Sequence, residues 1–136
     1  MFLTKESDYG LRIIRALACG KTKSVQTVSK EQHISQKYAY KIVNRLQAAA
    51  YITAKRGCQG GIHLAKPLES ISMMDIINAI EPGRYVFECL SDSSKCPFKS
   101  QESPCTFHKE MARIQKLTQE ALGETSIKAL IDSDYS

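Results

Sequence analysis

Three cysteines and one histidine toward the end of the chain have side chains suited to binding a metal. Six residues separate Cys89 from Cys96, eight separate Cys96 from Cys105, and His108 stands three positions further on. Thiolates and imidazoles are the usual ligands of zinc, and thiolates also hold iron–sulfur clusters. The set therefore predicts a metal site that holds either an iron–sulfur cluster or a structural zinc ion. Thiols that bind no metal are the third interpretation.

The segment that carries the cysteines is poor in apolar residues. Residues 90–104 read L-S-D-S-S-K-C-P-F-K-S-Q-E-S-P. Such a sequence cannot bury a core of its own, and a loop of this length in a small domain is usually functional or disordered. Because metal binding can supply folding free energy that a sequence lacks, we expect the order of residues 89–105 to depend on a bound metal.

An enzyme is the least supported interpretation of the same residues. Cys105 and His108 are three positions apart on an expected helix, where a nucleophile and a base could meet. No orienting carboxylate, oxyanion hole or pocket accompanies them in the sequence. We therefore expect the protein not to be an enzyme.

The chain has features of a cytoplasmic protein. Charged residues interrupt its first 20 positions, which excludes a signal peptide, and no apolar run approaches the ~20 residues needed to cross a bilayer. Thiols in the cytoplasm stay reduced, so the five cysteines are expected as ligands or core residues rather than as disulfides. Cys19 is expected in the core, and Cys58, close to two basic residues, could be an activated thiol.

The charge is divided unequally along the chain. Residues 1–66 contain 12 Lys and Arg and 3 acidic residues, a balance of +9, whereas residues 67–136 contain 7 and 11, a balance of −4. A strongly basic half predicts a polyanionic partner, and duplex DNA is the commonest one. We therefore expect residues 1–66 to bind DNA.

Residues 1–66 predict a winged helix-turn-helix domain. Apolar residues recur at helical spacing over 5–19, 25–32 and 36–49, and Ser24 and Ser35 stand where they can cap the second and third helices. Two short stretches of strand character, 51–55 and 62–64, flank a glycine-rich turn. The expected fold is thus mainly α with a small β-hairpin wing.

The third of these helices carries the residues expected to read DNA. A recognition helix enters a major groove about 12 Å wide and must present donors from its first turns. Lys37, Tyr40 and Lys41 occupy such positions, and Arg45 is placed to contact phosphate. Tyr38 is expected to be buried, where it would anchor the helix.

The hairpin is expected to contact the neighbouring minor groove. Lys55 and Arg56 stand at its base, and arginine is favoured by the negative potential of a narrow minor groove. Gly60 and Gly61 can supply the backbone angles of a tight turn and a close approach to the DNA backbone.

Residues 67–136 are expected to form a linker, a short helix over 73–80, the cysteine loop 89–105, a dimerisation helix over 106–122 and a C-terminal tail. In the long helix the apolar residues form one stripe and charged residues fill the other positions. An amphipathic helix of this kind needs a partner surface, and a second copy of itself is the simplest one. Packing back on its own chain is the alternative.

The chain resembles the Rrf2 superfamily of bacterial transcription regulators. The matching residues are Leu3-Thr4-Lys5, Asp8-Tyr9, Ile34-Ser35, Tyr38, Arg45-Leu46, Arg56-Gly57, Gly60-Gly61, Asp75-Ile76-Ile77 and Ile80-Glu81. The resemblance covers roughly residues 1–122. It implies a homodimeric winged-helix protein with a long crossed dimerisation helix.

The resemblance also implies a cofactor. Three cysteines at this place hold an iron–sulfur cluster in the family, which maps its ligands onto Cys89, Cys96 and Cys105. The fourth ligand stays open: His108 matches the cluster-assembly regulators, Asp8 matches the nitric-oxide sensors, and His33 lies in a region that some redox-sensing members use. The wide cysteine spacing leaves 2Fe–2S and 4Fe–4S both possible.

The sequence thus predicts a DNA-binding transcription regulator, in the first place a repressor, whose DNA affinity is set by a cluster on the loop 89–105. The alternatives are a cluster-free repressor that responds to thiol oxidation or to a metabolic enzyme as partner, and a protein with a structural zinc at the three cysteines and His108. No membrane partner is expected.

Overall fold

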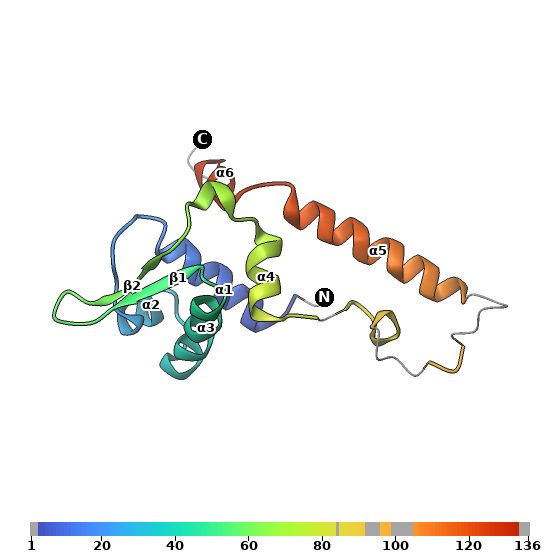
Figure 1. Ribbon diagram of the computed structural model, residues 1–136, viewed down its shortest axis with the longest axis horizontal. Helices are drawn as coiled ribbons and strands as arrows, with labels where there is room; N and C mark the ends of the chain where they lie inside the picture. Colours follow the sequence, from blue (N-terminus) through green and yellow to red (C-terminus); the bar gives the residue numbers. More distant parts are fainter. Residues whose placement is uncertain (1–2, 84, 92–95, 99–104, 134–136) are drawn as a thin grey trace.

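The computed structural model describes residues 3–83, 85–91, 96–98 and 105–133. Figure 1 shows a body that contains the first three helices and the hairpin, and a long helix that extends away from it. In chain order the elements are α1 (Lys5–Ala16), α2 (Val25–Glu31), α3 (Gln36–Ala48), β1 (Ile52–Lys55), β2 (Gly61–Leu64), the 3-10 turn η1 (Leu68–Ser70), α4 (Met73–Ile80), the 3-10 turn η2 (Glu88–Leu90), α5 (Thr106–Gly123) and α6 (Ile127–Ser133).

Side chains with hydroxyl groups begin four of the helices. Thr4, Ser24 and Ser35 accept hydrogen bonds from the backbone N–H groups of the first turns of α1, α2 and α3. Ser72 and Asp75 form a reciprocal capping box at the start of α4. Each cap satisfies backbone donors that have no partner inside the helix. The expected helices therefore begin where the sequence predicted, but α1 ends at Ala16, before the expected Cys19.

One core joins the three N-terminal helices to later parts of the chain. Ile13, Ile42 and Leu46 are fully buried, and Ile76 of α4 and Ile127 of α6 belong to the same cluster. The expected boundary at residue 66 therefore does not separate two hydrophobic cores. Burial of such side chains is the main source of the stability of a small domain.

Gly10 allows α1 and α4 to pack closely. A Cβ atom at this position would lie 2.9 Å from Cγ1 of Ile80 and 3.3 Å from Cγ2 of Ile76. A side chain at this position would overpack the contact and push the helices apart. The lack of a side chain at Gly10 thus allows α4 to pack closely on α1.

The hairpin is pinned to the body by the segment before α2. Strands β1 and β2 are antiparallel, with Ile52 opposite Leu64 and Lys55 opposite Gly61. The backbone of Lys23 exchanges two hydrogen bonds with Ile62, of 3.0 and 2.7 Å. The base of the wing is therefore held on one side by the helix-turn-helix segment, while its tip projects away from the body (Figure 1).

Helix α5 has few contacts with the other residues that the structure describes. None of its 18 residues is buried. Leu122, near its C-terminal end, packs against Met74 and Ile77 of α4, and the rest of the helix extends away from the body (Figure 1). Phe107 and Leu117 are 78% and 51% exposed. Among the described residues, contacts of α5 with its own chain include Leu122 with α4 and Gln115 with Val86, and dimerisation through the helix stays a prediction.

Candidate nucleic-acid interface and cysteine segment

The turn between α2 and α3 is rigidly built. The buried hydroxyl of Ser29 donates to the carbonyl of Ile34 at 2.6 Å, and the backbone N–H of Ile34 donates to the carbonyl of Ser29 at 3.0 Å. His33 lies between them with a φ of 54° and is exposed. These contacts fix the angle at which α3 leaves α2.

Helix α3 presents a polar face to solvent. Its buried residues are Ala39, Ile42, Val43 and Leu46, which follow one helical stripe. Lys37, Tyr40 and Lys41 are exposed, and Tyr40 keeps 48% of its surface accessible. The three expected base-reading side chains therefore share the accessible side of the expected recognition helix.

The expectation that Tyr38 is buried is wrong. Tyr38 is 47% exposed, because the buried stripe begins at Ala39, one position later along the helix. Its ring instead lies 6.1 Å from the ring of Tyr9 on α1. Sequence periodicity could have placed it correctly, since positions 39, 42, 43 and 46 are the stripe that fits helical spacing best.

Two cations of α3 are engaged inside the molecule. Nζ of Lys41 lies 2.5 Å from Oε1 of Glu6, and Nη1 of Arg45 lies 2.6 Å from Oε2 of the same carboxylate. Nη1 of Arg45 also donates to the carbonyl of Ile80 at 3.0 Å. Glu6 could not be recognised from the sequence, because it stands 35 positions before Lys41 and no periodic signal links the two.

The wing exposes its basic residues. Lys55, Arg56 and Cys58 are all on the surface. Gly61 has a φ of 146°, and a Cβ on it would lie 2.4 Å from the carbonyl of Lys23, whereas a Cβ on Gly60 would meet the carbonyl of Lys55 at 2.4 Å. The fold itself thus requires both glycines, independently of any close approach to DNA.

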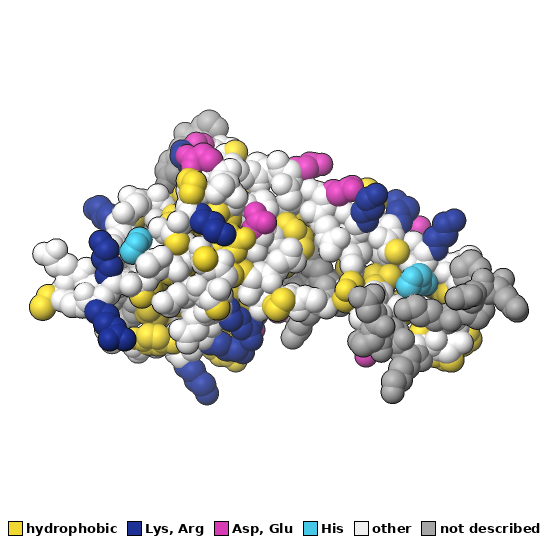
Figure 2. Space-filling model, in the orientation of Figure 1, with side chains coloured by type: hydrophobic (Ala, Val, Ile, Leu, Met, Phe, Trp, Pro, Cys, Tyr) yellow, Lys and Arg dark blue, Asp and Glu magenta, His cyan; other side chains and the backbone are white. Residues whose placement is uncertain are grey.

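Basic side chains gather around the wing and the lower edge of the body in the view of Figure 2, where α3 lies. Acidic side chains are seen over α6 and along α5, and α5 also carries Lys and Arg side chains toward its far end. The basic side chains around the wing and α3 suit a polyanionic partner.

Cys89 and Cys105 lie at the other end of the molecule. Cys89 belongs to η2, and Cys105 immediately precedes α5, so both are near the far end of that helix (Figure 1). The backbone N–H of Val86 donates to the side chain of Gln115 on α5 at 2.9 Å, which ties the approach to Cys89 to this helix. Cys89, Cys96 and Cys105 are partly exposed free thiols.

The donor set fits a metal by chemistry, but the described residues do not assemble it. In residues 3–83, 85–91, 96–98 and 105–133, no three His, Cys, Asp or Glu side chains are grouped closely enough to hold a metal ion. The parts of the expected loop over 92–95 and 99–104 lie outside the described residues. His108 is half-buried in the first turns of α5.

The other two candidates for the fourth ligand are on the body. Asp8 pairs with Arg12 at 2.7 Å, and His33 is exposed in the α2–α3 turn. Cys19 and Cys58 are exposed, so the expectation that Cys19 is buried is wrong. The cause is the early end of α1 at Ala16, which leaves Cys19 in the turn that follows.

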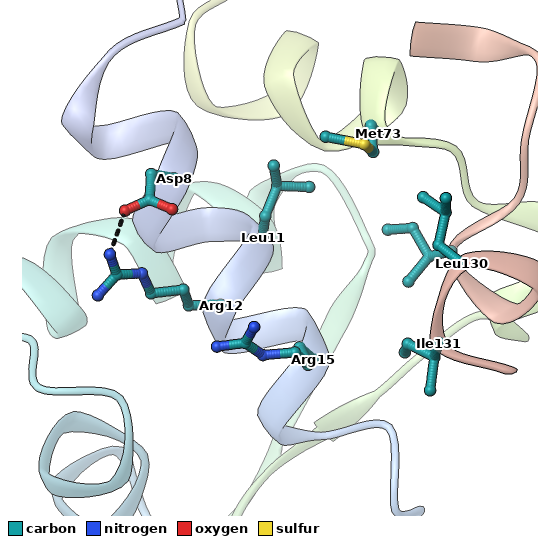
Figure 3. A pocket seen from close by; sticks show the side chains of 8 residues that line it. Asp8, Leu11, Arg12, Arg15, Met73, Leu130 and Ile131 are labelled. Carbon is teal, nitrogen blue, oxygen red and sulfur yellow. Dashed lines mark ion pairs between the residues drawn. The ribbon is translucent and has the colours of Figure 1, made fainter. Parts of the chain in front are cut away.

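A pocket of about 400 Å³ adjoins Asp8, between α1 and α6. Leu11, Arg12 and Arg15 of α1 line one side, and Met73, Leu130 and Ile131 line the other (Figure 3). The Asp8–Arg12 ion pair closes one edge of it, so the carboxylate of Asp8 is engaged in this structure. The described residues form no helix of the length and apolarity that crossing a membrane requires.

The helix-turn-helix with its pinned hairpin defines a winged helix-turn-helix protein of the DNA-binding class. The family model Rrf2, described as an iron-dependent transcriptional regulator, matches residues 3–133. The chain belongs to this family, whose members are DNA-binding transcription regulators and not enzymes.

Solved structures share the fold over almost the whole chain. The global cysteine regulator CymR of B. subtilis matches with a TM-score of 0.76 and 23% identity, covering 100% of this chain and 98% of that one. IscR of T. potens matches with a TM-score of 0.76 and 20% identity, covering 98% and 88%. The oxidized form of CymR from Staphylococcus aureus matches with a TM-score of 0.73 and 25% identity, covering 96% and 95%. Nothing in these comparisons supports a metabolic enzyme as partner.

Proposed function

We propose that the protein acts as a homodimeric repressor whose affinity for its operator is controlled by an iron–sulfur cluster. The proposal of a dimer is supported by α5, an amphipathic helix of 18 residues of which none is buried. Apolar surface of this extent is stabilised when a second copy covers it. A dimer of this kind presents two α3 helices to half-sites about 34 Å apart on one face of the duplex.

Base recognition is assigned to Lys37, Tyr40 and Lys41, and backbone contact to Arg45, Lys55 and Arg56. The support is exposure for all but Arg45, which is half-buried against Glu6. A lysine ammonium can donate to the acceptors of guanine, and a tyrosine can donate, accept or contact a thymine methyl. The wing cations suit the adjacent minor groove.

Tyr40→Ala and Arg56→Ala are expected to change DNA binding in different ways. Removal of Tyr40 takes away a base contact, so base preference at one position per half-site should relax, a loss of about 1–3 kcal/mol in discrimination. Removal of Arg56 should weaken binding mainly at sites with a narrow minor groove. Selection of bound duplexes from a random pool measures both effects. An unchanged preferred sequence for Tyr40→Ala would refute the role of Tyr40.

The cluster is assigned to Cys89, Cys96 and Cys105, with His108 as the fourth ligand in the same chain. The support is that all three thiols are free and partly exposed and that Cys89, Cys105 and His108 lie near one end of α5. Asp8 or His33 would have to come from a second copy, since both are on the body, away from this end (Figure 1). When bound, a cluster supplies metal–thiolate bonds between η2 and the start of α5.

The cluster can influence DNA affinity because Cys89 and Cys105 lie beside the proposed dimerisation helix α5. A change at the start of α5 can alter how two copies cross, and so the separation of the two α3 helices. A coupling free energy of about 1–3 kcal/mol corresponds to roughly 5–150-fold in affinity.

The test is operator affinity of cluster-loaded and cluster-free protein, prepared without oxygen and compared at one salt concentration. We expect the two affinities to differ at least fivefold, the lower limit of the range above. Equal affinities would refute cluster control and leave only the DNA-binding function of the family. An anaerobic absorption spectrum and metal analysis of the same samples separate iron–sulfur from zinc and from free thiols.

A further inference from the structure

Glu6 bridges the start of α1 to the accessible face of α3. Its carboxylate oxygens lie 2.5 Å from Nζ of Lys41 and 2.6 Å from Nη1 of Arg45. The side chain of Glu6 is 24% exposed, against 47% for Lys41 and 36% for Arg45. Glu6 and Arg45 are therefore half-buried and Lys41 is exposed, at the edge of the surface assigned to DNA.

A carboxylate in this position competes with DNA phosphate for the same two cations. Each oxygen of Glu6 accepts one of them, as a phosphate oxygen would. Lys37, one helical turn before Lys41, has no ion pair within the described ranges. Among the described residues, α3 thus pairs Lys41 and Arg45 with a carboxylate and leaves Lys37 without an ion pair.

We propose that Glu6 sharpens specificity by keeping Lys41 and Arg45 paired until an operator displaces it. The inference rests on the proposed role of α3 as the DNA-reading helix. Phosphate contacts are independent of sequence and supply nearly all of non-specific binding. On random DNA, phosphate alone must therefore compete with Glu6 for the two cations, whereas on an operator the base contact assigned to Lys41 and the other base-edge contacts help to displace the carboxylate.

The chemistry of the site keeps Glu6 ionised. The hydrogen bond from Lys41, followed by that from Arg45, holds the pKa of Glu6 below its ordinary value against the effect of burial. The second contact of Arg45, with the carbonyl of Ile80 at 3.0 Å, keeps its guanidinium beside the carboxylate. Both cations remain engaged at neutral pH unless a stronger acceptor displaces Glu6.

The test is Glu6→Gln, which keeps the size of the side chain and removes its charge. Binding of the variant to a random-sequence duplex is measured by fluorescence anisotropy over a range of KCl concentrations. Each cation released to a phosphate should steepen the slope of log K against log salt by about 0.9, so we expect a change of about 0.9–1.8. The ratio of operator to random-DNA affinity should fall.

Asp132→Asn is the matched control. Asp132 pairs with Lys128 on α6 at 2.6 Å, so this change removes the same charge and breaks an ion pair outside α3. The control should leave the slope unchanged. An unchanged or shallower slope for Glu6→Gln, or an equal steepening in Asp132→Asn, would overturn the proposal.

A second measurement keeps the test independent of the folding of Glu6→Gln. In chains that retain Glu6, Lys37→Ala should make the slope about 0.9 shallower, and Lys41→Ala should change it clearly less. Equal decreases of the salt slope in Lys37→Ala and Lys41→Ala would overturn the proposal. If Lys37→Ala leaves the slope unchanged, the role of α3 fails as well. If Lys37→Ala lowers it but Glu6→Gln does not steepen it, only the role of Glu6 fails.

Discussion

Cys105→Ser is expected to yield a protein that holds no iron–sulfur cluster when it is purified without oxygen. Cys105 immediately precedes α5 and is one of three partly exposed free thiols near that end of the described chain. A serine hydroxyl is a poor substitute for a thiolate, and two cysteines with one histidine cannot complete the expected set. Visible absorption, together with iron and sulfide content per chain, measures the loss.

The matched controls are Cys19→Ser and Cys58→Ser. Both of these thiols are exposed and lie on the body, after α1 and on the wing. We expect each control to retain the absorption of the unmodified protein. Equal iron and sulfide in Cys105→Ser would remove Cys105 from the ligand set. If the unmodified protein is colourless and contains zinc, the site holds a structural zinc ion and not an iron–sulfur cluster.

Leu117→Glu is expected to convert the dimer into monomers and to weaken operator binding by about 10²–10⁴, because two linked DNA-binding units then act singly. Leu117 is 51% exposed on a helix that buries none of its residues. A carboxylate there would have to lose its hydration inside an apolar interface, which is costly when no partner compensates it. Sedimentation analysis and operator titration give the two measurements.

Lys116→Glu provides the control, because it introduces the same residue one position earlier. Lys116 is 78% exposed and faces Glu120 at 3.9 Å, on the charged side of α5. We expect this control to remain dimeric. A dimeric Leu117→Glu, or monomers from both variants, would show that the apolar stripe of α5 is not the dimer interface.

The proposed DNA contacts and the proposed cluster ligands lie in two separate regions of the molecule. The wing and α3 lie at one end of the molecule, and Cys89 and Cys105 lie near the far end of α5 (Figure 1). Such a separation allows a metal-dependent change to act on the dimer without contacting DNA. The coupling then depends on α5 and α4, which pack together through Leu122, Met74 and Ile77.

The helices and the hairpin could be predicted from the sequence, since their signals are local. Ser24 and Ser35 cap helices at the expected positions, and the helices expected over 73–80 and 106–122 match α4 and α5. The glycines of the hairpin were recognised for the same reason. Hydrogen bonds within a few residues of each other fix these features, so the local sequence contains the information.

The sequence predicted the burial of single side chains less accurately than the positions of the helices. Tyr38 and Cys19 were expected in the core and are exposed. A rotation of about 100° per residue separates a buried from an exposed position on a helix, so an error of one position changes the outcome. The early end of α1 at Ala16 had the same effect on Cys19.

The sequence by itself determined the class of protein, because the capped helices, the glycine hairpin and the basic residues on α3 and the wing are encoded in short stretches of the chain. Only the tertiary structure brought Glu6 against Lys41 and Arg45, and only it showed that α5 buries none of its residues. The physical reason is distance along the chain. Contacts between α1, α3 and α4 depend on how the helices pack around one core, and no local pattern of residues records that packing.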